Sequence, residues 1–214
     1  NCGWCCSRLS SSLEVINLLQ HQPQFFGTFP QFLDDCRTGT LPDFSFIEPN
    51  YSDHDGDSGA ILASDQHPDH HVQEGERFIA AVYNAIRQNA ALWESTALLV
   101  VYDEHGGIYD HVPPPACTPD VFVASPEATE TGKAFQFDRL GVRVPAILIS
   151  PWVPRGTVVD TNRVFEHASI PATATSFFIG QFDDRSPREK AAETFLDLLT
   201  LNIMRTDAPQ FDLG

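Results

Sequence analysis

Apolar residues recur with two different patterns along the chain, and the two patterns alternate. Spacing typical of amphipathic helices occurs at residues 13–19, 29–38, 73–88, 169–179 and 187–201. Short continuous apolar runs, typical of buried strands, occur at residues 44–47, 96–102 and 144–150. Strands that alternate with helices predict an α/β fold, with a mainly parallel sheet flanked by helices.

Segments without periodicity separate these elements. Residues 50–71 are rich in Asp, Ser, Gly and His, which predicts a long loop, and loops of this length inside compact domains are often functional. Residues 112–136 form a proline-containing excursion. The folded part is expected to span residues 1–204, and residues 205–214 are expected to form a loose tail.

The charge balance narrows the range of partners. The 214 residues include 29 acidic and 13 basic side chains, which give a net charge of −16. This balance argues against binding to nucleic acid, whose affinity depends on Lys and Arg, and against electrostatic docking on anionic membranes. No apolar run has the length of a transmembrane helix. A neutral lipid head group, peripheral contact with a membrane, or a phosphate held through a metal ion remains compatible with the sequence.

The five cysteines do not form a clear metal motif. Three of them lie within the first six residues, and Cys2 and Cys5 have the spacing of half a structural zinc site. Cys36 and Cys117 are too far apart in sequence to supply the second half. We expect a frayed terminus that carries free thiols, and a disulfide remains an alternative.

The most informative segment is residues 98–111. An apolar run leads directly into Asp103, Glu104 and His105, and two glycines follow. In open α/β sheets, ligands bind at the carboxyl ends of such strands, and glycines permit a sharp turn close to a ligand. Carboxylate oxygens beside an imidazole suit a divalent cation or a phosphate ester. The alternative is a strand that ends in solvated polar residues.

Several sequence blocks resemble one known family. Residues 102–115 read YDEHGGIYDHVPPP, which is similar to the signature of the phosphoesterase family that contains non-specific phospholipases C and certain acid phosphatases. The other blocks follow in the family's order: LPDFSFIEP at 41–49, HP at 67–68, VQEGERF at 72–78, FDRLGVRVP at 137–145, ISPW at 149–152 and FEHASIPAT at 165–173. The resemblance covers residues 40–195, is strongest to the plant and fungal phospholipase C branch, and implies an alkaline-phosphatase-like fold.

The resemblance also implies roles for individual residues. Asp103 and Glu104 match the family's metal-binding pair, which suits a hard ion such as calcium, magnesium or manganese. The catalytic candidates are His67, Glu104 and His105. His67 would face the phosphate as a general acid or a phosphate-binding donor. His105 would orient a carboxylate or contact phosphate, or act only as a structural histidine.

The remaining histidines have weaker functional interpretations. Asp110 and His111 are expected to support the loop of the site, with a direct catalytic role as the alternative. A metal cluster of His67 with His70 and His71 is not favoured, because residues three and four positions apart come together only on a helix, and this segment precedes the helix.

His167 is expected to be structural at a helix start. We expect the acidic segment around His54 to be solvated rather than to bind calcium; its acids are Asp53, Asp55 and Asp57.

The expected function is metal-assisted hydrolysis of phosphate esters, with phospholipase C-type cleavage of phospholipids first and acid phosphatase activity as the alternative. The chain departs from the family pattern in one respect. Family members begin with a Glu-Asn-x-Ser-Phe-Asp motif that supplies metal ligands, followed by a Ser or Thr nucleophile, and this chain contains neither that motif nor an obvious context for the nucleophile. We therefore expect the chain to be the C-terminal portion of a family member, N-terminally truncated. A truncated fragment that only binds metal or phosphate is the further alternative.

Overall fold

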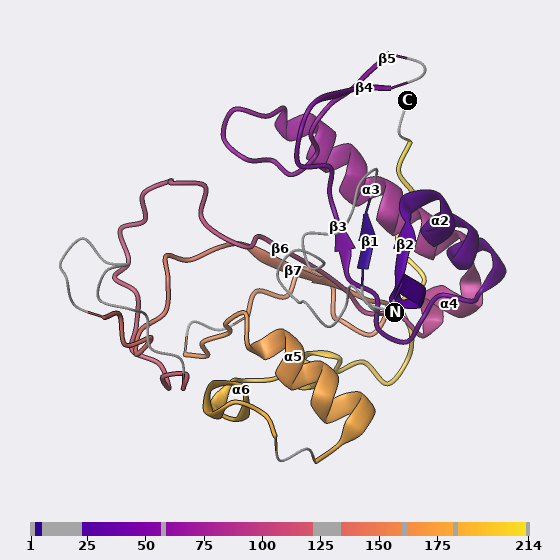
Figure 1. Ribbon diagram of the computed structural model, residues 1–214. Coiled ribbons are helices and arrows are strands. Elements are labelled where there is room, and N and C mark those ends of the chain that lie inside the picture. The colour runs from indigo at the N-terminus through magenta and orange to yellow at the C-terminus, as the bar shows by residue number, and fades with distance from the viewer. Residues whose placement is uncertain are drawn as a thin grey trace. The chain divides into compact units, whose positions relative to one another are not determined.

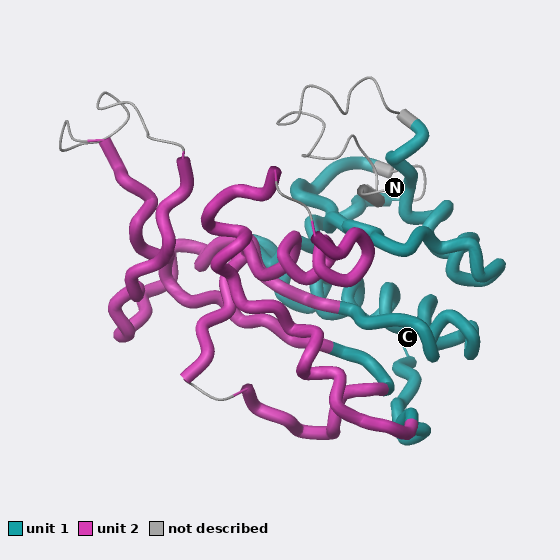
Figure 2. Tube along the Cα trace, turned by 90° about the horizontal axis from the view of Figure 1, so that it is seen from below, with its two compact units in different colours: residues 1–98, 149–151, 204–214 teal, residues 99–148, 152–203 magenta. Residues whose placement is uncertain are grey.

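The computed structural model describes residues 3–5, 23–56, 59–121, 134–159, 162–181 and 184–212. The helices and strands are labelled in Figure 1. The chain divides into two compact units, each of which is described by itself (Figure 2). Unit 1 comprises residues 1–98, 149–151 and 204–214, and unit 2 comprises residues 99–148 and 152–203.

Unit 1 contains a small parallel sheet. Strands β1 (Gly3–Cys5), β2 (Phe26–Thr28) and β3 (Ile47–Glu48) pair in the order β2-β1-β3, and both pairings are parallel. The 3-10 turn η2 (Pro23–Phe25) precedes β2. The expectation of a frayed terminus is therefore wrong at Gly3–Cys5, because this segment hydrogen-bonds on both edges.

Three helices of unit 1 follow from local signals. Helix α2 (Phe29–Thr38) begins after Thr28, whose N–H donates to Gln31 Oε1 at 2.7 Å, and it ends at Gly39 with a left-handed φ of 75°. Helix α3 (Val72–Gln88) confirms the predicted helix at 73–88. Helix α4 (Ala90–Glu94) was not expected, and Asn89 caps it by accepting a hydrogen bond from the N–H of Leu92. The helix expected at 13–19 lies outside the described residues.

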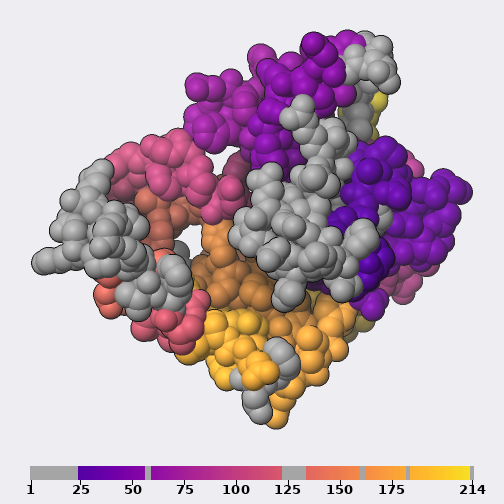
Figure 3. Space-filling model, viewed as in Figure 1, coloured from indigo at the N-terminus to yellow at the C-terminus, as the bar shows by residue number. Residues whose placement is uncertain are grey.

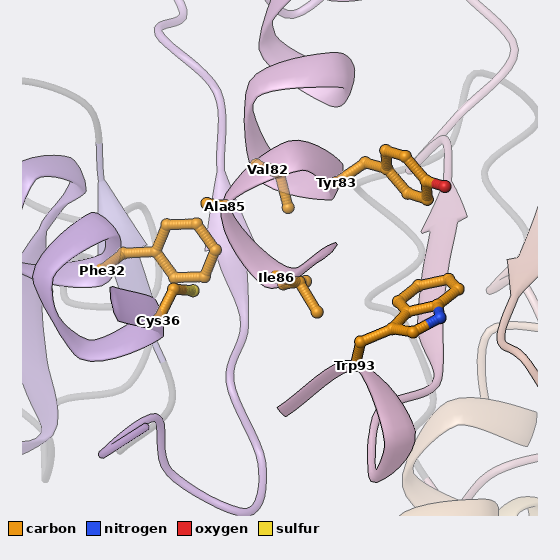
Figure 4. Packing of buried hydrophobic residues seen from close by; sticks show 7 residues of the cluster. All are labelled: Phe32, Cys36, Val82, Tyr83, Ala85, Ile86 and Trp93. Atoms are coloured by element: carbon orange, nitrogen blue, oxygen red, sulfur yellow. The ribbon is translucent and has the colours of Figure 1, made fainter. Parts of the chain in front are cut away.

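The hydrophobic core of unit 1 lies between these helices (Figure 4). Phe32 of α2 is fully buried, and α3 presents Val82, Tyr83 and Ile86 to the same cluster, which Trp93 of α4 completes. The rings of Tyr83 and Trp93 meet edge to face with centroids 5.6 Å apart. Cys36 also lies in this cluster, and burial raises the pKa of its thiol to about 12, so it behaves as a small apolar side chain.

The segment expected to be a loose tail contacts α3. Tyr83 Oη donates to the carbonyl of Pro209 at 2.7 Å, and Asn84 exchanges two hydrogen bonds with the backbone of Phe211. The ring of Phe211 also packs on Tyr83 with centroids 5.5 Å apart. Tyr83 and Asn84 of α3 thus hold residues 209–211, a contact that no local sequence pattern predicted.

The described part of the long segment at 50–71 lies mostly at the surface (Figure 3). It contains a pair of short antiparallel strands, here called the hairpin. Strands β4 (His54–Gly56) and β5 (Gly59–Ile61) pair antiparallel. At its base, the N–H of Asn50 donates to Ser64 Oγ at 3.1 Å, and the N–H of Ser64 donates back to the Asn50 carbonyl at 2.8 Å. Paired strands and hydrogen bonds at their base therefore order this part of the chain, which is not an irregular loop.

Strands β6 (Leu98–Val101) and β7 (Ala146–Ile149) confirm two predicted strands and pair with each other. The expectation that they are buried is wrong among the described residues. All four residues of β6 are half-buried, and Ile147 of β7 is 59% exposed.

The helical part of unit 2 confirms one prediction and corrects another. Helix α5 (Ser169–Ala174) continues as the π-turn η4 (Thr175–Ile179) and ends at Gly180, as predicted. The helix expected at 187–201 is wrong, because α6 (Pro187–Ala191) ends early and only the 3-10 turn η5 (Leu196–Leu198) follows. Arg163 explains the interruption, since its guanidinium binds Glu193, Asp197 and the Thr194 carbonyl.

The fold is thus mixed α/β. Among the described residues, the strands form three small separate sheets in place of the one mainly parallel sheet that we expected. No helix in the described ranges has both the length and the apolar character needed to cross a membrane.

Candidate functional site

The acidic segment forms a tight turn directly after β6. Gly106 and Gly107 have φ values of 64° and 71°, which confirms that the glycines are needed for a sharp turn. Glu104 Oε2 accepts the N–H of Gly106 at 2.8 Å, and Asp103 Oδ1 accepts the N–H of Glu104 at 2.9 Å. One oxygen of each carboxylate thus fixes the turn. Both side chains are exposed, so these acids are accessible to a ligand.

His105 lies in the same turn but points back toward its own backbone. Its Nδ1 lies 3.1 Å from the carbonyl of Ile108, whose N–H donates to the His105 carbonyl at 3.1 Å. If Nδ1 carries the proton, Nε2 is the nitrogen available to another group. This arrangement fits a histidine that both holds the turn and presents one nitrogen.

An ion pair ties this turn to a second sequence block. Arg143 donates to both oxygens of Asp110, with Nε to Oδ2 at 2.7 Å and Nη2 to Oδ1 at 2.9 Å. The N–H of Val112 also donates to Asp110 at 3.1 Å. These hydrogen bonds hold the pKa of the Asp110 carboxyl well below its usual range, with Arg143 as the main cause. The predicted loop-supporting role of Asp110 is consistent with this contact, whereas the neighbouring His111 side chain is 83% exposed.

His167, just before α5, contacts the backbone at the end of β6. Its Nε2 lies 2.9 Å from the carbonyl of Tyr102, the residue immediately before Asp103. The preceding residue, Glu166, forms an ion pair with Arg188 at 2.5 Å, and both side chains are largely shielded from solvent. The start of α5 is therefore anchored to α6 and reaches the backbone that carries the two acids. This position agrees with the structural role expected for His167.

His67 lies in a surface loop of unit 1 that a neighbouring carboxylate organises. Asp65 Oδ1 lies 2.7 Å from His70 Nδ1 and also accepts the N–H of His67 at 3.4 Å. The N–H of His70 donates to the His67 carbonyl at 2.8 Å, and the two imidazole rings lie 5.9 Å apart. Asp65 is a site candidate that the sequence did not indicate. An Asp can accept the backbone N–H two residues further on, and this local pattern is what could have pointed to it.

The same loop is packed against the start of α3. Gln66 has a left-handed φ of 60°, and its Nε2 donates to the carbonyl of Val72 at 2.9 Å. A Cβ placed on Gly75 would lie 2.2 Å from Gln66 Cγ, so any larger residue at this helix position would force the Gln66 side chain to move. Asp69 also has a positive φ, of 117°. Such backbone geometry is retained where surrounding contacts over-determine it, which is common at functional loops.

Two further acids have roles that the sequence did not indicate. Glu48, at the carboxyl end of β3, is 1% exposed, and it accepts a hydrogen bond from Tyr51 Oη at 3.2 Å. Asp53 was expected to be solvated, but it accepts the N–H of Ala63 at 2.7 Å across the base of the hairpin. Buried or backbone-bound carboxylates depend on tertiary neighbours, so composition alone does not identify them.

Three of the predicted site residues, Asp103, Glu104 and His105, share one turn of unit 2. The fourth, His67, lies in a loop of unit 1. Across the part of the chain that the structure describes, no three His, Cys, Asp or Glu side chains gather closely enough to hold a metal ion. Asp103 and Glu104 supply two hard oxygen donors, which suit a divalent cation but do not complete its ligand set.

Comparison with known proteins identifies the family. A model of the phosphoesterase family matches residues 8–179. The chain belongs to the phosphoesterase family. It is 41% identical to non-specific phospholipase C6 and 40% identical to non-specific phospholipase C1 of Arabidopsis thaliana, over 84% and 83% of its own length. It is also 30% identical to the non-hemolytic phospholipase C of Burkholderia pseudomallei over 73% of its length. The resemblance inferred from the sequence blocks is confirmed.

The chain covers only part of these relatives. It spans 34% of the length of non-specific phospholipase C6, 33% of non-specific phospholipase C1 and 21% of the bacterial protein. Homology to phospholipase C hydrolases therefore applies to about a third of the length of the plant relatives.

We predict that Gly75→Ala lowers the stability of the protein by about 1–3 kcal/mol, the usual cost of overpacking. The added methyl would displace Gln66 and break its hydrogen bond to Val72. Thermal unfolding followed by circular dichroism measures the effect. Gly141→Ala is the matched control, because a Cβ there meets nothing within 4 Å, and an equal loss in both variants would contradict the packing argument.

We predict that Asp110→Asn lowers the melting temperature at neutral pH, and that the difference from the wild type shrinks only in strong acid. The folded-state pKa of Asp110 is depressed relative to the unfolded value of about 3.9. Its stabilisation is therefore fully present above about pH 5 and is lost as the pH falls toward the folded-state pKa. Melting temperatures at a series of pH values test this.

Asp34→Asn is the control for that series. Asp34 pairs with Arg37 on an exposed helix face, and such pairs contribute little. A constant difference between wild type and Asp110→Asn down to the most acidic pH would contradict the assigned role of the Asp110 carboxylate.

Proposed function

We propose that the protein is a phosphoesterase of the phospholipase C type, which hydrolyses the phosphodiester of a phospholipid on the glycerol side. The observation that carries this proposal is the family match over residues 8–179 together with relatives named as phospholipases C in plants and bacteria. The position of two accessible acids in a tight turn at the end of β6 supports it.

Hydrolysis of a phosphodiester has three requirements. Negative charge on the phosphoryl oxygens must be neutralised, the leaving alkoxide must receive a proton, and a nucleophile must attack phosphorus. We assign the first two to described residues of this chain. We assign the first to a divalent cation to which Asp103 and Glu104 contribute oxygen ligands, because carboxylates are the donors that such ions prefer. The third requirement is the nucleophile, which we place outside this chain, as the family resemblance indicates.

The histidines supply the proton and the contacts to phosphate. His67 is exposed in its loop and is assigned to the phosphate, either as a donor to its oxygens or as the general acid. His105 is held by the Ile108 carbonyl and is assigned to a phosphate contact or to the orientation of the neighbouring acids. Glu104 joins the catalytic set through the metal. Calcium, magnesium and manganese are the preferred ions for such oxygen ligands.

We further propose that the whole protein has an alkaline-phosphatase-like fold. The parallel pairing of β1 with β2 and β3, and the helices α2 and α3 beside them, support an α/β core of this kind. The substrate is a phospholipid, reached by peripheral contact with a membrane or in a dispersed form. The net charge of −16 favours a zwitterionic or neutral lipid surface over an anionic one.

We predict that the full-length protein hydrolyses p-nitrophenyl phosphorylcholine faster than p-nitrophenyl phosphate, and that a chelator abolishes both reactions. Asp103→Asn and Glu104→Gln should each lower kcat by at least about 10²-fold, because they remove charge from groups that hold the metal. Release of p-nitrophenolate measures the rates, and chelated enzyme resupplied with calcium, magnesium or manganese identifies the ion.

Asp55→Asn is the matched control, since Asp55 is an exposed acid of β4 and should leave the rates unchanged. Faster hydrolysis of the monoester would indicate acid phosphatase activity instead. No turnover by a folded protein that still binds the metal would indicate a binding role.

A further inference from the structure

The histidine of the surface loop that is best placed to transfer a proton is His70, which the family resemblance did not assign. Its Nδ1 lies 2.7 Å from Asp65 Oδ1, within the range of a charge-assisted hydrogen bond. The Asp65 side chain is 12% exposed and that of His70 is 27% exposed, so this contact is partly shielded from water. A carboxylate bonded to one nitrogen fixes the imidazole tautomer and leaves the other nitrogen available.

The loop holds this pair in one geometry through several independent contacts. The N–H of His67 bonds the same carboxylate oxygen, and the N–H of His70 closes a turn onto the His67 carbonyl. Gln66 and Asp69 are both retained with positive φ, and Gln66 is seated on Gly75. A strained loop over-determined in this way is suited to positioning a side chain for reaction.

His67 differs from His70 in its surroundings. Its side chain is exposed, whereas that of His70 is held against Asp65, and the two rings are 5.9 Å apart. Two adjacent imidazoles with different environments are suited to different tasks, because the orienting carboxylate serves only one of them. The exposed ring suits a contact with phosphate oxygens, and the oriented ring suits proton transfer.

We propose that Asp65 and His70 form a carboxylate–imidazole dyad that protonates the leaving alkoxide, and that His67 binds the phosphate. This proposal rests on the proposed phosphoesterase function. The ionised nucleophile, which we place outside this chain, bonds to phosphorus as the bond between phosphorus and the glycerol oxygen breaks. The proton on His70 Nε2 passes to that oxygen, and the alcohol leaves. The imidazole keeps its Nδ1 proton, which stays hydrogen-bonded to Asp65. Water then displaces the nucleophile from phosphorus: its hydroxyl bonds to phosphorus, its remaining proton returns to His70 Nε2, and the nucleophile leaves in its ionised form.

The experiment compares two substrates of the full-length protein that differ in the leaving group. Dihexanoylphosphatidylcholine releases an alkoxide that needs a proton, whereas p-nitrophenyl phosphorylcholine releases a much weaker base that leaves without one. His70→Gln should lower kcat by about 10²–10⁴-fold on the lipid and by less than about tenfold on the nitrophenyl ester, because general acid catalysis matters most for poor leaving groups. Asp65→Asn should show the same selectivity with a smaller loss.

Two variants separate this role from a structural one. His67→Gln should lower kcat on both substrates by a similar factor, since phosphate binding is common to both. His71→Gln is the matched control, because His71 is the next residue, is exposed, and does not cap α3 through its side chain. It should leave both rates unchanged.

The outcomes distinguish the two proposals. If the wild type hydrolyses neither substrate, the proposed function fails and the dyad with it. The dyad alone is overturned if the wild type is active and His70→Gln lowers kcat by the same factor on both substrates. It is likewise overturned if His70→Gln is as active as the wild type. If His70→Gln does not fold by circular dichroism, the ratio measured with Asp65→Asn decides in the same way.

Discussion

Carboxylates that accept backbone N–H groups hold both loops that carry the candidate chemistry. Asp65 accepts the N–H of His67 in one loop, and Glu104 accepts the N–H of Gly106 in the other. Backbone groups in loops lack the regular partners of helices and strands, so a side-chain acceptor both satisfies them and fixes the turn. The candidate side chains are therefore positioned mainly by local geometry. Longer-range contacts, such as Asp110 with Arg143, then attach the turns to the rest of their units.

These contacts also explain how acids can serve two purposes. Asp103 and Glu104 each use an oxygen to shape the turn and remain exposed enough to meet a ligand. Asp110 is instead committed to Arg143 and Val112, which keeps it charged and unavailable. Neighbouring acids of one sequence motif thus separate into groups that present charge and groups that hold structure. His167, whose Nε2 contacts the Tyr102 carbonyl, also holds structure in this way.

The sequence predicted the elements whose signals are local. The capping residues around α2, the periodicity of α3 and the apolar run of β6 each specify their element without help from the rest of the chain. The sequence did not predict the features that depend on tertiary contacts. Arg163 draws residues 193–197 out of the expected helix, and Tyr83 and Asn84 hold the end of the chain that had no pattern of its own. For the candidate site, the family blocks predicted Asp103, Glu104 and His67, and these roles stay predictions. The Asp65–His70 contact emerged only from the geometry.

The central claim is that this protein cleaves a phosphodiester between phosphorus and the glycerol oxygen. Phosphorus-31 NMR of phosphatidylcholine incubated with the full-length protein tests it most directly, because each cleavage position yields a different phosphorus compound. Our account predicts phosphorylcholine as the phosphorus-containing product, with one diacylglycerol released per phosphorylcholine. Phosphatidic acid, inorganic phosphate as the first product, or unchanged phosphatidylcholine would contradict it.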